Sequence, residues 1–252
     1  MNRRMILRPL IFVYCMLNLF SESSAQSIPD TTFNRAISRI ESAYWTSGRL
    51  HIKIGYNYEE HDSTGTTYDS MMIQVDAHQD SFYIVSDSIE QMQNGSYRIV
   101  VYNQDSIIQV QSPSPFYYNL INATLLTEEF RNQFITGYTK TDSFNFRTLA
   151  IQFKNTSPYL CYEITYDTTD HFISSIYCRI KKGDYLTPGS EMLLMNQSDG
   201  FVSIRQIFAT SIDATFDSQI FESSRFFTVQ NGSLVPVTPY ANYELFNSIV
   251  QQ

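Results

Sequence analysis

Two of the three cysteines, Cys161 and Cys178, have a spacing that suits covalent chemistry. They flank a polar segment around 169–170 that predicts the turn of a long hairpin. A hairpin centred there places the two cysteines opposite each other, with Cβ atoms ~4.5 Å apart, close to what a disulfide requires. In an oxidising compartment we therefore expect a Cys161–Cys178 disulfide, with two buried free thiols on adjacent strands as the alternative.

The other residues that could do chemistry form no catalytic or metal-binding pattern. No histidine is spaced from another as metal ligands are, and none belongs to a cysteine motif; the four are His51, His61, His78 and His171. The motifs G-x-S-x-G and H-E-x-x-H and a Gly-rich phosphate loop are missing from the sequence. The sequence therefore predicts a protein that is not an enzyme and that needs neither a metal nor a cofactor.

The first 25 residues have the pattern of a signal peptide. Arg3 and Arg4 precede an apolar stretch over 9–20, and Ser23-Ser24-Ala25 supplies small residues at a cleavage site. The apolar stretch is too short to span a bilayer comfortably, so we prefer a cleaved signal to an uncleaved anchor helix. We expect a soluble protein exported to the periplasm, with the extracellular space as the alternative.

Charge and composition narrow the partners and the fold class. The formal net charge is −8, and an acidic surface argues against nucleic acid and anionic lipid headgroups as primary partners. The chain has 18 Tyr and 18 Phe but only 9 Gly, which is typical of a strand-rich folded protein. No Pro- or Gly-rich linker and no repeat of fixed period divides it, so 26–252 is expected to form one domain.

The stretch 50–110 predicts an antiparallel meander. Apolar side chains alternate with polar ones from Leu50 to Tyr58, which gives a sheet with one apolar face and one polar face. The pair Asn94-Gly95 predicts a tight hairpin turn, and Asn231-Gly232 predicts another near the end of the chain. Further strands are expected over 144–208.

Two segments could cover the apolar face. Residues 33–44 repeat apolar side chains at helical spacing, with Thr31 or Thr32 as a cap and Gly48 as the end. Residues 116–126 are apolar without alternation, and Thr127 with Glu128 and Glu129 resembles a cap, so 115–134 predicts one broken helix or two short ones.

This order of elements resembles the LolA/LolB-like superfamily of periplasmic lipoprotein carriers. The matching parts are the helix at 33–44, the strands of 50–110, a lid at 114–134 and the later strands at 144–208. The resemblance implies a mainly β fold with a few helices, in which a single antiparallel, half-closed β-barrel wraps over an N-terminal helix and an inserted helical lid. The Ser-Ser-Ala-Gln site and the aromatic, Ser/Asp/Asn-rich composition resemble those of a Bacteroidetes envelope protein.

The resemblance also implies a cavity between sheet and helices that takes acyl chains. The residues expected to line the cavity or the lid are Ile52, Ile54, Tyr56, Phe82, Ile84, Ile99, Val101, Phe116, Leu120, Ile121 and Leu125. One hypothesis is a non-enzymatic carrier of an apolar ligand, meaning an acyl chain, a lipid or a lipoprotein anchor. The alternative is a structural or protein-interaction component of the cell envelope, in which the helices fill the barrel permanently.

Overall fold

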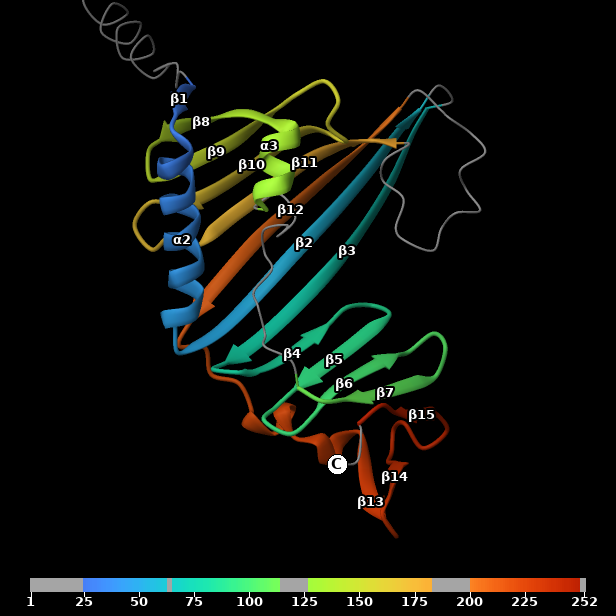
Figure 1. Cartoon of the computed structure of the whole chain (residues 1–252). Helices are drawn as coiled ribbons and strands as arrows, with labels where there is room; N and C mark the ends of the chain where they lie inside the picture. The colour runs from blue at the N-terminus through green and yellow to red at the C-terminus, as the bar shows by residue number, and fades with distance from the viewer. Residues whose placement is uncertain (1–24, 63–64, 114–126, 183–199, 250–252) are drawn as a thin grey trace, which may run out of the picture.

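The computed structural model describes residues 25–62, 65–113, 127–182 and 200–249 (Figure 1). The expected signal peptide up to residue 24 and the apolar segment 114–126 lie outside these ranges. The described chain is mainly β, with two α-helices, α2 (Asp30–Thr46) and α3 (Glu128–Phe134). Its main sheet has thirteen strands, and all neighbouring pairs in it are antiparallel except β15 with β7. The edges are formed by β1 and β15, so the sheet is open, as a half-closed barrel requires.

The main sheet is ordered β1-β8-β9-β10-β11-β12-β2-β3-β4-β5-β6-β7-β15. In chain order the strands are β1 (Gln26–Ile28), β2 (Arg49–Asp62), β3 (Gly65–His78), β4 (Ser81–Val85), β5 (Ile89–Gln93), β6 (Arg98–Tyr102), β7 (Ile107–Gln111), β8 (Ile135–Ser143), β9 (Phe146–Phe153), β10 (Tyr159–Asp167), β11 (Ile173–Lys181), β12 (Phe201–Ile212), β13 (Phe227–Gln230), β14 (Ser233–Pro236) and β15 (Glu244–Asn247). The strands β13 and β14 form a separate hairpin. Two 3-10 turns, η4 (Ser218–Phe221) and η5 (Ser223–Arg225), link β12 to this hairpin.

The described residues contain a helix in each segment predicted to be helical, although only the last part of the second segment, 127–134, is described. The helix α2 starts at Asp30, and the carbonyl of Pro29 accepts the first hydrogen bonds, so neither predicted threonine caps it. Its four buried residues are spaced three or four apart and are 1–3% exposed: Phe33, Ile37, Ile40 and Tyr44. The helix α3 has the predicted cap, because the Thr127 hydroxyl accepts the Phe130 N–H.

Strand register fixes which side chains share a face of the main sheet. Ile52 pairs with Val75, and Val75 pairs with Ile84, so the three point to one side. We call this side the helix face, because α2 and α3 pack on it, and the opposite side the outer face (Figure 1). A first core forms on the helix face between the two helices and the strands β8 to β12, β2, β3 and β4.

The apolar residues change sides between β4 and β5. Met92 of β5 pairs with Tyr83, and therefore lies on the outer face rather than the helix face. The residues in register with Met92 continue on that side, and together with the chain after residue 225 they form a second core: Met92, Ile99, Val101, Ile108, Val110, Phe226, Phe227 and Tyr240. In Figure 1 the C-terminal strands accordingly lie beside β4–β7, away from α2.

The prediction of a single apolar face over 50–110 is thus wrong. The strand β4 contains four consecutive large apolar residues, Phe82 to Val85, so it presents apolar side chains on both faces. Phe82 belongs to the first core and Ile84 packs against it, whereas Tyr83 packs against the second core. A strand of this kind lets the sheet be covered on opposite sides at its two ends.

The two predicted hairpin turns differ in outcome. Asn231 and Gly232 have φ values of 51° and 80° and join β13 to β14 directly, as a two-residue turn with positive φ requires. By contrast, β5 ends at Gln93 and β6 begins at Arg98, so the turn at 94–97 is longer than predicted. The Asn94 side chain holds it by accepting the N–H groups of Ser96 and Tyr97, each at 2.9 Å.

A buried carboxylate ties the C-terminal segment to the sheet. Glu90 is 7% exposed and accepts hydrogen bonds from the hydroxyls of Tyr83, at 2.8 Å, and Tyr240. Arg225 lies 3.4 Å from the same carboxylate and its guanidinium stands 5.0 Å from the Tyr83 ring centre. Burial, with the adjacent Glu90 charge, raises the pKa of both tyrosine hydroxyls, so they remain neutral donors.

We expect Glu90→Ala to lower the free energy of unfolding of the second core by about 2–4 kcal/mol, because it leaves buried donors without their acceptor. Hydrogen exchange should show faster amide exchange in β13 to β15 and little change in β9 and β10. The control is Glu244→Ala, which removes an exposed carboxylate from the same region. Equal effects of the two substitutions, or uniform loss of protection across both cores, would contradict the role given to Glu90.

Candidate functional site

Five of the predicted ligand-binding residues lie on the helix face. Ile52, Ile54 and Phe82 are buried in the first core. Tyr56 and Ile84 are half-buried and pack against its margin. The structure therefore brings these five side chains to one face: three are buried in the first core and two are half-buried at its margin.

The other predicted residues do not join this group. Ile99 and Val101 are 0% exposed in the second core, on the outer face, so they cannot line a cavity on the helix face. The reason is that the buried apolar residues lie on the outer face of the sheet from β5 onward. The four lid residues, Phe116, Leu120, Ile121 and Leu125, lie outside the described part of the chain.

Half-exposed apolar side chains continue the helix face along the long β2–β3 hairpin. Tyr56 pairs with Met71, and Ile54 with Ile73, so these side chains form adjacent rows. Met71 is 40% exposed. We call this set the rim strip; its members are Tyr56, Tyr58, Met71, Ile73 and Ile84. This surface lies at the margin of the first core and is partly exposed to solvent, so an apolar chain could bind along it.

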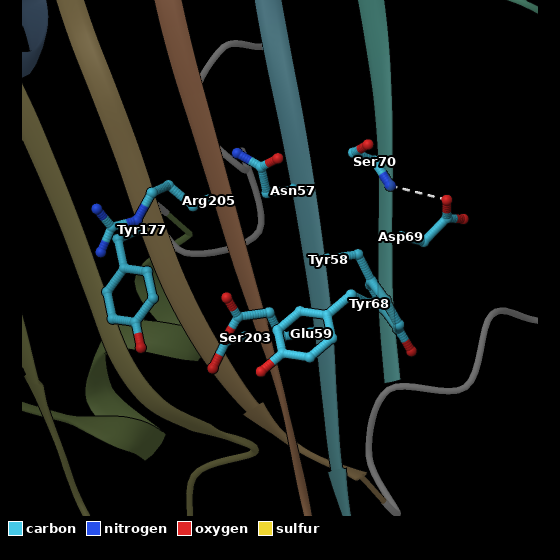
Figure 2. A pocket seen from close by; sticks show the side chains of 9 residues that line it. All are labelled: Asn57, Tyr58, Glu59, Tyr68, Asp69, Ser70, Tyr177, Ser203 and Arg205. Atoms are coloured by element: carbon cyan, nitrogen blue, oxygen red, sulfur yellow. Dashed lines mark hydrogen bonds between the residues drawn. The ribbon is translucent and has the colours of Figure 1, made fainter. Parts of the chain in front are cut away.

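The outer face of the same hairpin carries a polar pocket of about 620 Å³. Figure 2 shows Tyr177 and Arg205 on one side of the pocket and Asp69 and Ser70 on the other. The lining residues that point to the outer face are Asn57, Glu59, Tyr68, Ser70, Tyr177, Ser203 and Arg205, from β2, β3, β11 and β12. Tyr58 and Asp69, which pair with each other and belong by register to the helix face, complete the lining.

A chain of contacts organises one wall of this pocket. The Arg205 guanidinium lies 5.3 Å from the centre of the Tyr177 ring, and Arg179 donates to the Tyr177 hydroxyl at 3.1 Å. Arg179 also lies 4.5 Å from the Phe201 ring, on which His61 stacks. The wall offers planar groups and hydrogen-bond donors suited to a polar ligand. Sequence reasoning missed it, because arginines and tyrosines on the polar side of strands look like solvated residues until register brings them together.

Two of the histidines, His51 and His61, lie beside carboxylates of the same sheet. His51 lies on the outer face, as alternation predicts, and its Nδ1 is 2.6 Å from the buried carboxylate of Asp76. Glu59 and Glu60 point to opposite faces, and Glu59 lies 3.3 Å from His61. Within the described residues, no group of three or more His, Cys, Asp or Glu side chains could hold a metal ion. No helix among them is long and apolar enough to cross a membrane.

The predicted disulfide is not formed: Cys161 and Cys178 are free. Beside the turn, Tyr166 pairs with Ile173, which is the register expected from the sequence. The next pair is Thr165 with Ser175, so β11 contains one extra residue there and the pairs from Thr165 to Cys161 are shifted by one. Cys178 therefore faces Tyr162, inside the first core, whereas Cys161 lies on the outer face, so their side chains diverge.

No protein-family model matches the chain, and neither does any curated protein sequence. Among solved structures, it is similar to a DUF1329 family protein from Desulfovibrio piger ATCC 29098, at 11% identity and a TM-score of 0.33 over 78% of this chain and 98% of the other. A LolA superfamily protein from Nitrosomonas europaea matches at 7% identity and a TM-score of 0.32 over 76% and 97%.

The structure of MucB in complex with MucA(peri) matches at 11% identity and a TM-score of 0.34 over 81% of this chain and 62% of the other. These neighbours include LolA superfamily and DUF1329 proteins. All of these similarities are distant in both sequence identity and TM-score.

We expect both thiols to react slowly with iodoacetamide at pH 8 in the folded protein. Burial raises the pKa of Cys178 to about 11, and burial together with the Glu163 carboxylate raises that of Cys161 to about 12. The reactive thiolate is therefore rare, and labelling should be slower than for a free thiol with pKa ~8.5 by roughly a few hundredfold at Cys178 and roughly a thousandfold or more at Cys161. Both pKa values are raised above the unfolded value of ~8.5. The folding stability linked to the protonated thiols is therefore fully present below about pH 8.5 and is lost as pH rises through 11–12.

The control is the unfolded chain without reductant, in which two cysteines outside the signal segment should label quickly. If these two fail to label until a reductant is added, a disulfide exists and the register argument is wrong. The variant Cys161→Ser separates the rate of the buried thiol from that of the half-buried one.

Proposed function

We propose that this chain is an exported, single-domain, non-enzymatic protein that binds or carries an apolar ligand on its helix face. The ligand class is an acyl chain, a lipid or a lipoprotein anchor. The observation that carries the proposal is the rim strip, a set of partly exposed apolar side chains that extends from the first core along the β2–β3 hairpin and includes Ile84 of the adjacent β4. Export to the periplasm follows from the signal-peptide pattern of residues 1–25.

The physical basis of binding is the removal of apolar surface from water. Each CH₂ group that becomes buried contributes roughly 0.8 kcal/mol, so a chain covering even part of the strip gains several kcal/mol before ordering costs. The strip lies at the margin of a packed core, so a ligand bound there would contact fixed side chains on one side. An open sheet also leaves the helix face accessible from its edges, which a closed barrel would not.

The alternative is a structural or protein-interaction component of the envelope whose barrel is permanently filled. It is favoured by the packing of α2, whose inward side chains are 1–3% exposed against the first core. In that case the rim strip is only the boundary of the core. The two proposals differ in whether an apolar probe binds at the strip.

We expect Met71→Asp to weaken binding of the neutral dye N-phenyl-1-naphthylamine by about tenfold, because it places a charge on the strip (a tenfold change is ~1.4 kcal/mol). The matched control is Met72→Asp. Met72 is the next residue of β3, is 55% exposed and lies on the outer face, so its substitution should leave the dye affinity within about twofold. Fluorescence titration of the three proteins measures the difference.

Native mass spectrometry of the purified protein provides the second measurement, since a carrier should retain lipid or detergent. If the wild-type protein binds no dye and carries no lipid, the carrier proposal fails and the filled-barrel alternative stands. Equal loss of dye binding in both variants would show that the dye does not bind at the rim strip.

A further inference from the structure

A small pocket between α2 and the strands β8 and β9 is lined by four cationic side chains. Its volume is about 140 Å³, and its cations are Arg35, Arg39, Lys140 and Arg147. Thr32 and Tyr166 add hydroxyl groups, and the apolar part of the wall consists of Ile28, Ala36 and Leu149. We call this site the basic pocket. It lies on the helix face, because Lys140 and Arg147 are in register with core residues of β9 and β10.

The charge of the basic pocket is opposite to that of the whole chain, which is −8. Among the described residues, Asp142 is the only carboxylate that forms an ion pair with any of the four cations, and its partners are Lys140 and Arg147. Arg147 binds it through two nitrogens, at 2.5 and 3.2 Å, and Lys140 lies at 3.5 Å. One negative charge therefore faces four positive charges, and the hydrogen bond from Arg147 holds the pKa of Asp142 below its usual value.

The two helix arginines carry most of the uncompensated charge. Arg35 and Arg39 are four residues apart on α2, so their side chains are neighbours, and like charges at this spacing repel each other. Both are exposed and line the same pocket. Packing of the first core fixes the side of α2 that turns toward the sheet, and this arrangement brings the arginines beside Lys140 and Arg147. An anion in the pocket would relieve the repulsion.

We infer that the basic pocket binds the phosphate group of a phosphate ester. Guanidinium groups donate paired hydrogen bonds that match the oxygens of phosphate, and two arginines with a lysine and two hydroxyls can surround a tetrahedral anion. The volume corresponds to about four or five water molecules of ~30 Å³ each, enough for one phosphate group. The apolar wall of Ile28, Ala36 and Leu149 suits the carbon substituent of an ester.

This inference goes beyond the proposed apolar site, because it involves none of the residues of the rim strip. The phosphate could belong to the headgroup of a lipid or to a soluble phosphate ester, and the chemistry of recognition is the same for both. The net negative charge of the chain opposes approach to an anionic membrane, whereas the basic pocket attracts a single phosphate at short range.

The test compares two double variants that remove the same charge. Arg35→Gln/Arg39→Gln removes two cations from the basic pocket, and Arg49→Gln/Lys53→Gln removes two from the outer face. The probes are inorganic phosphate and glycerol 3-phosphate, measured by calorimetry at pH 7 and low salt, and vesicles of phosphatidylcholine with or without phosphatidylglycerol, measured by co-sedimentation. We expect the first variant to lose at least about tenfold in affinity, and the second to stay within about twofold of wild type.

Binding of the soluble esters with this pattern supports the inference and identifies a soluble source. Binding only to vesicles that contain phosphatidylglycerol, with the same pattern, supports it and identifies a lipid headgroup. Absence of binding to all probes overturns it, as does equal loss in the two variants, which would indicate general attraction of anions. Dye binding at the rim strip should be unchanged in Arg35→Gln/Arg39→Gln, so failure of this inference and failure of the proposed function can be told apart.

Discussion

The register of the main sheet determines where everything else in this molecule can lie. The β2–β3 hairpin pairs residue by residue from Arg49 with His78 to Asp62 with Gly65, so each side chain is committed to one face. On the helix face this places Ile52 and Val75 under α2, and on the outer face it places His51 beside Asp76. The rim strip and the polar pocket are consequences of the same pairing, since they occupy the two faces of one hairpin.

The same constraint explains why the sheet needs two covers. The strands β3, β4 and β5 are paired in a continuous register, and in this register the buried apolar residues from β5 onward lie on the outer face. A helix from the N-terminal part covers one face at one end, and the chain after residue 225 covers the other face at the other end. Because Glu90 lies within the second core, it requires buried partners, which Tyr83, Tyr240 and Arg225 supply.

Local patterns in the sequence predict the elements of this fold well and its long-range arrangement poorly. Helical spacing finds α2, a cap finds α3, and Asn231-Gly232 finds the last hairpin. The disulfide fails because one extra residue in β11 shifts Cys178 from Cys161 to Tyr162, and a bulge leaves no signal in composition. Ile99 and Val101 are rightly predicted as apolar strand residues, but their face depends on pairing through β4. The basic pocket and the polar pocket join residues from separate elements, which no local spacing reveals.

The second core also has a consequence for how the chain acquires its structure. Glu90 and Tyr240 are 150 residues apart, whereas β4 to β7 pair with near neighbours in sequence. The meander can therefore form early, while Met92, Ile99 and Val110 remain uncovered on its outer face until the last part of the chain has been made and has docked. High contact order of this kind slows folding and prolongs exposure of apolar surface. The interval before docking is when this protein most needs protection from association with other chains, and a chain shortened before residue 226 would remain in that condition.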